Sequence, residues 1–555
     1  MSDLASKSDA AGTARITHFD VIVIGAGFAG LYMLYRLRLL GLSVQVLERG
    51  SGVGGTWFWN RYPGARCDVE SMDYSYSFSP ELEEEWEWTE RYPAQPEILR
   101  YLNHVADRFD LRRDIQLNTL VTRAHYREDT NTWRVTTADG VQLSARYCVM
   151  ALGCLSSVNR PNFEGLASFS GAWYHTGAWP PEGVDFTGQR VGCIGTGSSA
   201  IQAIPQIAKQ AAQLFVFQRT PNYSVPAQNG PLDPETQRSI KLSYRERRRK
   251  SRESRAGFPM DPPLRGALDT TPEERQRVYE VGWQKGGIAA LNGSFNDLMT
   301  NADANQTAAE FVRTKIRETV HDPAVAEALI PTDYPIGTKR LCVDIDYYQT
   351  YNRDNVTLVD VKRAPIQEVT PTGLRTRFAE YALDSIVFAT GYDAMTGPLF
   401  DIDLRGTGGH TLRAKWIDGP RTYLGIATAG FPNMFMITGP GSPSVLSNMV
   451  ISIEQHVDWV ADCLRYLTEH DIDRIDASLD AETRWVEHVN EVADKTLYPL
   501  ANSWYVGANI PGKPRIFMPY VGGVGVYRQK CDEVAAREYA GFVLSRAGGL
   551  PAAQR

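Results

Sequence analysis

The chain has 555 residues, 43% of them hydrophobic, and a formal net charge of −7 at pH 7. This length exceeds one ordinary hydrophobic core, so two or three domains are expected. The negative charge argues against a general nucleic-acid or anionic-membrane binder, and no uninterrupted apolar run is long enough to span a membrane. The seven scattered cysteines form no Cys-x-x-Cys pair, which predicts reduced thiols in a cytoplasmic protein.

The polar stretch 1–18 is expected to be a loose tail and not a signal peptide. Directly after it, residues 20–24 are short, apolar and β-branched, which predicts a buried strand. Gly25, Gly27 and Gly30 follow, and their spacing suits a tight turn, a close approach to a pyrophosphate and close helix–strand packing. A second predicted strand ends at Glu48, 18 residues after Gly30, where a carboxylate can accept hydrogen bonds from a ribose 2′-OH. A glycine turn without a ligand is the weaker alternative.

A second glycine cluster, residues 51–55, follows Glu48 directly. Its last glycine, Gly55, lets another loop approach the same ligand, which suits a long dinucleotide such as FAD better than NAD. Residues 60–68 are then dense in glycine, proline and charge, so they are predicted to be a loop.

The strand and glycine turn recur near residue 191. The second turn consists of Gly195, Thr196, Gly197, Ser198, Ser199 and Ala200. Counting 18 residues from Ala200 reaches Gln218, so a neutral amide replaces the acid of the first motif. A ribose 2′-phosphate is then not repelled, and the next residue, Arg219, can pair with it. We therefore expect FAD at the first motif and NADPH at the second, against the alternative that both repeats bind one cofactor type.

These patterns predict an α/β protein with two Rossmann-like dinucleotide-binding domains and a helical insertion in the NADPH domain. Strands that end near 150 and 388 run into small residues, which suggests two related crossovers between the domains. The expected division is an FAD-binding domain at 1–154 and 391–555, an NADPH-binding domain at 155–230 and 336–390, and the insertion at 231–335.

The insertion contains a basic run that begins at Arg245 and reaches Arg252, with more positive charge up to Arg255. Such a run can be a nucleic-acid or localisation patch, or simply a solvated helix face. The acidic whole chain and the neighbouring glutamates favour the solvated face.

Two nucleotide sites on one chain imply electron transfer. Disulfide reductases share this layout, but they need a redox cysteine pair near the flavin loop, and here that region has only Cys67. Two charged pairs remain as candidates: Lys339 with Arg340, and Arg66 with Asp68. An arginine held by a carboxylate near a flavin would stabilise an anionic intermediate. The alternative for either pair is an ordinary surface ion pair.

Between the glycine motifs, Phe169, Gly171, His175, Trp179 and Pro180 form the pattern Phe-x-Gly-x₃-His-x₃-Trp-Pro. By itself, the histidine would be interpreted as an ordinary linker residue bonded to backbone. Together with both glycine turns, the pattern resembles the fingerprint of Baeyer–Villiger monooxygenases, closest to the phenylacetone and steroid monooxygenase branch. The resemblance extends from about residue 20 to residue 544.

This resemblance implies that NADPH reduces FAD, that O₂ adds to the reduced flavin, and that the resulting peroxyflavin attacks a ketone to give an ester or lactone. It assigns Arg340 to stabilising the anionic species and Asp68 to tuning that arginine. Lys339, Arg219 and Thr220 match positions at the NADP phosphate.

The remaining matched positions concern the cavity. Trp504 matches a mobile segment that closes over NADP, and Arg66 lies in the flavin-side loop. The positions that match FAD or substrate contacts are Thr56, Trp57, Trp59, Tyr74 and Met449. The ketone is expected to be bulky, aromatic or steroid-like. Two rival hypotheses stay open, a related monooxygenase that oxygenates nitrogen or sulfur and a non-catalytic redox sensor, and the oligomeric state is not predicted.

Overall fold

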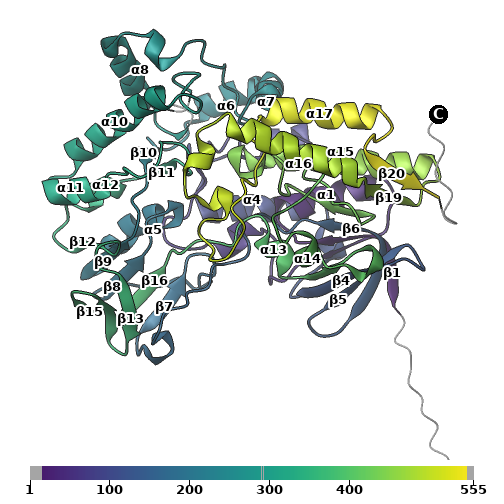
Figure 1. The fold of residues 1–555 in the computed structure, drawn as a ribbon, viewed down its shortest axis with the longest axis horizontal. Coiled ribbons are helices and arrows are strands. Elements are labelled where there is room, and N and C mark those ends of the chain that lie inside the picture. The colour runs from purple at the N-terminus through teal and green to yellow at the C-terminus, as the bar shows by residue number, and fades with distance from the viewer. Residues whose placement is uncertain (1–15, 289–290, 292, 547–555) are drawn as a thin grey trace, which may run out of the picture.

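The computed structural model describes residues 16–288, 291 and 293–546. The fold is α/β, as predicted, and contains two separate sheets of mainly parallel strands (Figure 1). The sheet that contains β1 (Thr17–Ile24) lies at the right of Figure 1, and the sheet that contains β8 (Arg190–Ile194) lies at the left. Each sheet is covered by helices. The first glycine turn follows β1 and the second follows β8, so the two turns belong to two different sheets.

The first sheet has eight strands in the order β17-β4-β5-β6-β1-β2-β3, with β18 paired to β6. The pairs between β1, β2, β3 and β6 are parallel, whereas β4, β5 and β6 form an antiparallel meander. The other strands are β2 (Val44–Leu47), β3 (Ile115–Gln116), β4 (Val121–Arg127), β5 (Thr132–Thr137), β6 (Gln142–Met150), β17 (Asp403–Arg405) and β18 (Met434–Met436).

The N-terminal boundary of this sheet differs from the prediction. Thr17 and His18 pair with Leu143 and Ser144 of β6, so these two residues are not part of a loose tail. The pairing partner, more than a hundred residues away in the chain, supplies backbone hydrogen bonds that local polarity does not reveal. Of the rest of the predicted tail, Ile16 is described and residues 1–15 lie outside the described residues.

Strand β1 is buried on both faces. Val21 and Val23 belong to one apolar cluster, and the alternate residues Ile22 and Ile24 belong to another. Successive side chains of a strand point to opposite faces, so a continuous apolar run is what a doubly covered parallel strand requires. Helices α1 (Phe28–Leu39) and α15 (Met449–Glu469) supply much of the first cluster.

The second sheet is parallel throughout, in the order β12-β9-β8-β16-β7. Its other strands are β7 (Ala172–His175), β9 (Gln213–Gln218), β12 (Val356–Asp360) and β16 (Ser385–Phe388), and helix α5 (Ser198–Ala208) follows β8. A small antiparallel sheet of β13 (Ile366–Thr370), β14 (Gly373–Thr376) and β15 (Glu380–Ala382) packs beside it. The predicted second strand–turn–helix–strand unit is therefore confirmed, and the domain boundaries remain a proposal that this arrangement supports.

The described residues of the insertion form helices and no strand. They are α6 (Pro234–Leu242), α7 (Tyr244–Glu253), α8 (Pro272–Lys285), α10 (Ala302–Thr319) and α11 (Pro323–Leu329). Tyr244 of α7 packs into the core of the first sheet, whereas Tyr279 of α8 and Phe311 of α10 pack into the core of the second. The insertion thus contacts both halves of the molecule.

The predicted solvated face of the basic run is wrong for part of it. Arg245, Arg249 and Lys250 are exposed, but the side chain of Arg248 is only 3% exposed and is paired with Glu83. Arg247 is paired with Asp73. The carboxylates come from a segment about 170 residues earlier, and only the folded chain brings them to α7.

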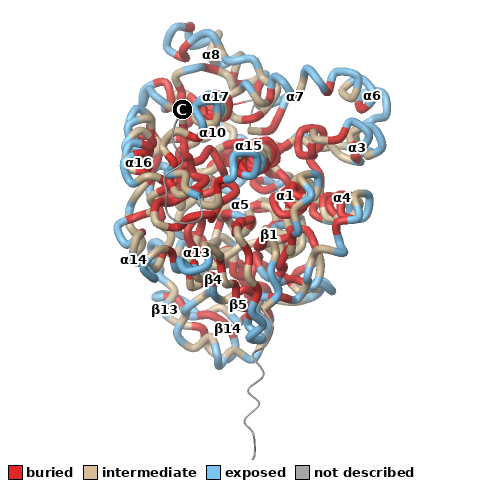
Figure 2. The backbone as a smooth tube through the Cα atoms, turned by 90° about the vertical axis from the view of Figure 1, so that its right-hand side faces the viewer, coloured by how far each residue is buried: buried red, intermediate tan, exposed pale blue. Residues whose placement is uncertain are grey.

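Other helices and two further strand pairs complete the described fold. They are α2 (Thr56–Trp59), α3 (Pro80–Glu85), α4 (Gln95–Arg108), α12 (Tyr347–Thr350), α13 (Gly397–Phe400), α14 (Leu412–Lys415), α16 (Leu479–Asp494) and α17 (Val524–Ala536), and the strands β10 (Ser224–Pro226), β11 (Cys342–Asp344), β19 (Arg474–Ala477) and β20 (Phe542–Ser545). Buried residues concentrate around α1, α5 and α15, and exposed residues are frequent on α3, α6 and α8 (Figure 2). All seven cysteines are buried and free, and none of the described helices is both long and apolar enough to cross a bilayer.

The first glycine turn generates a stability prediction. A Cβ on Gly30 would lie 1.8 Å from the carbonyl oxygen of Gly25, so Gly30→Ala must push α1 away from β1. We expect the free energy of unfolding to fall by about 3 kcal/mol, since overpacking a rigid backbone contact is costly. Thermal unfolding measures it.

Gly41→Ala is the matched control, because Gly41 has φ of +73° and no protein atom lies within 4 Å of the position that a Cβ would take there. Its cost is the left-handed backbone alone, about 1 kcal/mol. Equal destabilisation by the two variants would contradict the packing role of Gly30.

Candidate functional site

A cavity of about 280 Å³ lies at the carboxyl ends of β1 and β2. Both predicted glycine loops line it, together with residues from the distant helix α15. The predicted site residues in its lining are Gly25, Gly27, Glu48, Gly55, Thr56, Trp57, Trp59, Tyr74 and Met449. In open α/β sheets ligands bind at this edge, so the structure brings these residues to one binding site.

The two glycine loops touch each other through their backbones. A Cβ on Gly27 would lie 3.3 Å from the Cα of Gly55, and a Cβ on Gly55 would lie 2.9 Å from the Cα of Gly27. No side chain fits between them, so the cavity keeps a wall of bare backbone, which is what a pyrophosphate needs for close approach.

Glu48 is held rigidly at the same cavity. Its side-chain oxygens accept hydrogen bonds from the backbone nitrogens of Ala26 at 2.8 Å and Gly50 at 2.7 Å, and the residue is only 4% exposed. These two bonds leave the carboxylate further acceptor capacity. The glycine wall and this oriented acid together fit the ribose and pyrophosphate of a dinucleotide such as FAD.

Two aromatic residues and α15 shape the other side of the cavity. The indole nitrogen of Trp57 donates to the phenol oxygen of Tyr74 at 3.1 Å. Burial raises the pKa of Tyr74 well above its ordinary value, so this phenol stays neutral. Met449 is the first residue of α15, whose N-cap, Asn448, accepts from the backbone of Val450.

The second glycine turn has an open face. A Cβ on Gly197 would meet no protein atom within 4 Å, so there is room for a ligand over the N-terminus of α5. The hydroxyl of Thr196 donates to the carbonyl oxygen of Thr220 at 2.8 Å and joins the turn to the end of β9. Arg219 and Thr220 line a second cavity, of about 190 Å³.

The second cavity has mixed charge, because Arg219 and Lys362 line it together with the carboxylates of Glu327, Asp333 and Asp360. Burial and the neighbouring Arg219 lower the pKa of Lys339, whose ammonium also lies 4.4 Å from the centre of the Tyr334 ring. A phosphate bound between Lys339 and Arg219 would offset the repulsion between these two cations. Gln218 points its amide nitrogen at the carbonyl oxygen of Ala328, at 2.7 Å. The position that carries an acid in the first motif is therefore neutral here, and the residues present fit NADPH.

Arg340 and Asp68 form an ion pair that contacts the first cavity through a lining residue, although neither of the two is itself in the lining. Arg340 Nε and Nη2 donate to the two oxygens of Asp68 at 2.9 and 2.6 Å, and Nη1 donates to the carbonyl oxygen of Val445 at 2.7 Å. Val445 lines the cavity. The guanidinium thus lies at the cavity edge with its orientation fixed on two sides, while 25% of the side chain stays exposed.

The guanidinium of Arg340 stays positively charged. Burial by itself lowers the pKa of this guanidinium, but the Asp68 carboxylate and the nearby Tyr505 more than offset it, so the pKa lies above its ordinary value. Arginine is already permanently charged in proteins. The arrangement can therefore present a fixed positive charge to an anion that forms in the cavity.

Arg66 and Asp68, noted as a charged pair of the same loop, do not bind each other. Arg66 Nη1 instead donates to Glu90 at 2.8 Å and to the carbonyl oxygen of Tyr92, because the loop turns the two side chains to different partners. Asp68 is left for Arg340, 272 residues later in the chain.

Sequence reasoning missed Gln202. Its amide nitrogen donates to the carbonyl oxygen of Arg66 at 3.0 Å, and its amide oxygen accepts from the hydroxyl of Tyr62 at 2.8 Å. Helix α5 of the second sheet thereby holds the loop that carries Asp68. A polar side chain one helical turn after Ser198 was the only local signal.

The segment between the two motifs also reaches the cavity. His175 ends β7, and its Nδ1 accepts from the backbone nitrogen of Gly177, which lines the cavity. His175 Nε2 lies 3.2 Å from the hydroxyl of Thr390. The histidine is thus bonded to backbone. Trp504 packs in one apolar cluster with Val445 and Met449, which places it beside the cavity as well.

The chain is 45% identical over 531 residues to a Baeyer–Villiger monooxygenase from Pseudooceanicola batsensis, covering 95% of this chain and 96% of that protein. It is 55% identical to the solved structure of an oxidized steroid monooxygenase bound to NADP, with a TM-score of 0.92, covering 96% of this chain and 100% of that chain. The chain belongs to the type I Baeyer–Villiger monooxygenase family. A phenazine N-monooxygenase from Lysobacter antibioticus is also 43% identical, covering 95% of this chain and 97% of that protein.

Residues 22–254 match a family model described as pyridine nucleotide-disulphide oxidoreductase. This match fits the two-nucleotide layout that Baeyer–Villiger monooxygenases share with disulfide reductases. The thiols do not fit reductase chemistry, because all seven are unpaired and burial raises the pKa of Cys67 well above its ordinary value. A protonated, buried thiol is a poor nucleophile, in agreement with the expected exclusion of that class.

The fingerprint histidine generates a pH prediction. Burial lowers the pKa of His175 from 6.5 to about 4. The ring therefore stays neutral in the folded state, whereas the unfolded chain takes up a proton at this residue below pH 6.5. The stability is therefore fully present above pH 6.5 and is lost as the pH falls toward 4, by roughly 3 kcal/mol for this residue. Urea unfolding at several pH values should show a shallower fall for His175→Gln.

His410→Gln is the control, since the exposed side chain of His410 has no buried environment to lose. An unchanged slope between pH 4 and 6.5 for His175→Gln would contradict the burial of a neutral ring at this position.

Proposed function

We propose that the protein inserts one oxygen atom from O₂ next to a ketone carbonyl, giving an ester or lactone. FAD and NADP(H) are its cofactors. The observation that carries the proposal is the bidentate Asp68–Arg340 pair at the edge of the dinucleotide cavity. When bound there, FAD supplies electrons from NADPH to O₂ and so an activated oxygen for the ketone.

In this proposal Arg340 stabilises negative charge that develops on oxygen during the reaction. Preorganised charge is most effective when it needs no reorientation, and one such donor is worth on the order of 100-fold in rate or more. Asp68 and the carbonyl oxygen of Val445 fix the guanidinium from two directions. Asp68 thus positions the arginine, and Arg340 contacts the reacting atoms.

The other residues bind and enclose the cofactors. Gly25, Gly27, Gly55 and Glu48 would hold the FAD pyrophosphate and ribose, with Gly30 supporting the turn. For NADPH, Gly195 to Ser199 would bind the pyrophosphate, and Arg219, Thr220 and Lys339 the 2′-phosphate. Thr56, Trp57, Trp59, Tyr74, Met449 and Trp504 would enclose the reacting groups, with Arg66 holding the loop of Asp68.

We infer a bulky, aromatic or steroid-like ketone as the substrate. The 55% identity to a steroid monooxygenase supports this class, as do the apolar lining residues Val445, Met449 and Ile453. Relatives named for cyclohexanone and acetone are 41% and 42% identical, so the size of the ketone is the open variable. A cytoplasmic location stays a prediction, with free buried thiols in its support.

Oxygenation of nitrogen is the second candidate, because a phenazine N-monooxygenase is 43% identical to this chain. Product mass and retention after incubation with linear, cyclic, aryl and steroid ketones, and separately with aromatic N-heterocycles, distinguish the two. Ester or lactone from the larger ketones supports the proposal. N-oxide as the only product overturns it, and NADPH consumption that no substrate stimulates would favour a redox sensor.

Removing the guanidinium should separate flavin reduction from oxygen transfer. We expect Arg340→Ala to keep bound FAD and to be reduced by NADPH, yet to form ester at least about 100-fold more slowly, because the fixed positive charge is gone. Stopped-flow flavin absorbance and product chromatography measure the two steps. Arg340→Lys is the matched variant that keeps a charge but loses the bidentate pair. Wild-type ester turnover in Arg340→Ala would refute the role.

The neutral Gln218 and the cation beside it should set the nicotinamide preference. The parent enzyme is expected to prefer NADPH strongly over NADH, and Arg219→Ala should raise the KM for NADPH by about 10-fold or more while leaving that for NADH nearly unchanged, since only NADPH carries the 2′-phosphate. Steady-state kinetics with both nucleotides measure it. Equal use of both by the parent enzyme would remove this interpretation of Gln218 and Arg219.

A further inference from the structure

The basic run of α7 is the one charged motif that the proposed function leaves unexplained. Its buried residues fall on one side of the helix: Tyr244, Arg248 and Ser251 are buried and Arg247 is half-buried, in the three-to-four residue spacing of one helix face. Arg249, on the opposite face, is exposed and pairs with Glu246 and Glu253 of its own helix. The run therefore has an inner set of arginines and an outer set.

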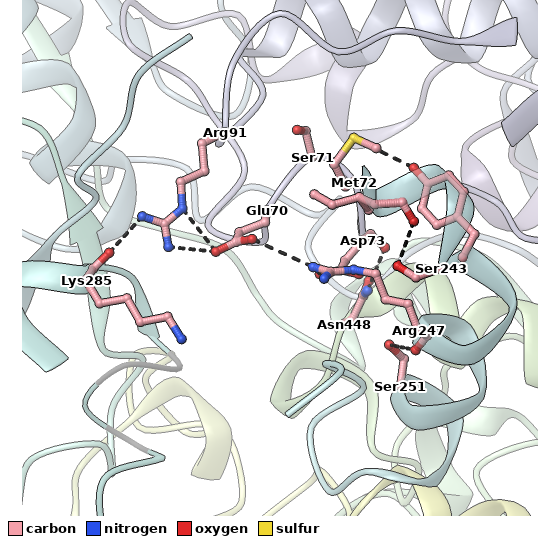
Figure 3. A network of polar contacts seen from close by, with 12 residues as sticks. Glu70, Ser71, Met72, Asp73, Arg91, Ser243, Arg247, Ser251, Lys285 and Asn448 are labelled. Carbon is pink, nitrogen blue, oxygen red and sulfur yellow. Dashed lines mark hydrogen bonds and ion pairs between the residues drawn. The ribbon is translucent and has the colours of Figure 1, made fainter. Parts of the chain in front are cut away.

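The inner arginines bind the segment 70–77 through hydrogen bonds and an ion pair. Arg247 Nε and Nη2 donate to the two oxygens of Asp73 at 2.7 and 2.6 Å (Figure 3). The Asp73 side chain is 4% exposed. Arg248 donates to the carbonyl oxygen of Asp73 at 3.1 Å and to the hydroxyl of Ser75 at 2.7 Å. Both the side chain and the backbone of Asp73 are thus fixed by α7.

The same network extends to α15. The amide nitrogen of Asn448 donates to the carbonyl oxygen of Asp73 at 2.8 Å, and Asn448 is fully buried. The backbone nitrogen of Asn448 donates in turn to the carbonyl oxygen of Ala256, just after α7. One turn further along, Arg252 binds the hydroxyl of Ser77, which donates to Glu454 of α15.

The network also reaches the part of the insertion that packs on the second core. Glu70 lies 3.8 Å from Arg247 and accepts two hydrogen bonds from Arg91. Arg91 Nη1 donates to the carbonyl oxygen of Lys285 at the end of α8, at 2.7 Å, so Lys285, Arg91, Glu70 and Arg247 form a chain (Figure 3). Helix α8 packs into the core of the second sheet through Tyr279.

The two segments that α7 fixes each contribute a wall of the flavin cavity. Tyr74 directly follows Asp73, and Met449 directly follows Asn448, and both line the cavity. A shift of Asp73 relative to α7 would move the backbone next to Tyr74. It would also disturb the hydrogen bond from the Asn448 amide to the carbonyl oxygen of Asp73. We propose that Arg247 and Arg248 are positioning residues that set the placement of Tyr74 and Met449, so that the helical insertion shapes the flavin and ketone pocket.

This inference rests on the proposed function only for the ketone measurements. The inner arginines are neither a solvated helix face nor a nucleic-acid-binding patch, because their donors already bind Asp73, Ser75 and Glu83. Buried pairs of this kind add specificity of placement more than net stability. Arginine suits position 247 better than lysine, because its planar guanidinium binds the two oxygens of Asp73 in a fixed orientation, whereas an ammonium is a point charge.

The test compares Arg247→Gln and Arg247→Lys with Arg249→Gln, a change of the same type on the outer face of the same helix. Holoenzyme is measured for the visible circular dichroism of bound FAD, for kcat and KM with a ketone that the parent converts, and for amide hydrogen exchange in peptides that cover 70–77 and 446–452. We expect Arg247→Gln to change the dichroism of bound FAD and to speed amide exchange in both peptides. The ketone KM should rise on the order of 10-fold, and kcat should fall by a smaller factor. Arg247→Lys should lie in between, and Arg249→Gln should match the parent.

A lower melting temperature for Arg247→Gln with parental dichroism and ketone KM would overturn the proposal, since that is the result of a purely structural role. If Arg247→Gln does not fold, Arg247→Lys decides by the same measurements, and parental values then count against the proposal. Should the parent convert no ketone, the proposed function fails, but the dichroism and exchange arms still decide whether α7 shapes the flavin cavity.

Discussion

The structure depends on one ion pair made by distant parts of the chain. Asp68 belongs to the loop after the first glycine motif, and Arg340 lies directly before β11, beside the second sheet. Two parallel hydrogen bonds fix both the distance and the plane of the guanidinium. The two side chains are half-buried, and removing one would leave the other charge without its partner. The loops around this pair must therefore keep the two halves of the molecule in register.

Several further contacts support this register. Gln202 of α5 holds the backbone of the Asp68 loop, and the carbonyl oxygen of Val445 holds Arg340 from the side of α15. His175, at the crossover between the sheets, is bonded to backbone as a neutral ring. The contacts of Gln202 and Val445 each join an element of one half of the molecule to a residue of the other half.

The helical insertion extends the same logic. Its first helices pack on the core of the first sheet and its later helices on the core of the second. Charge balance explains how a strongly basic helix can be buried there: the inner arginines meet the carboxylates of Asp73 and Glu83. A part of the chain that carries no nucleotide motif is thus bonded to the segments beside the flavin cavity.

Local sequence patterns determined the two strand–turn–helix units, the acid at Glu48, the amide at Gln218 and the helical character of the insertion, because short-range sterics and hydrophobic periodicity fix such elements. The pairing of Asp68 with Arg340 followed from the family resemblance and not from spacing, whereas local spacing alone pairs Asp68 with Arg66. The partners of Arg66, Arg247 and Arg248, the strand pairing of Thr17 and the clamp at Gln202 were decided only by the tertiary structure. The physical reason is common to all of them: a charge or an amide records its own chemistry in the sequence, whereas its partner is chosen by how distant segments pack.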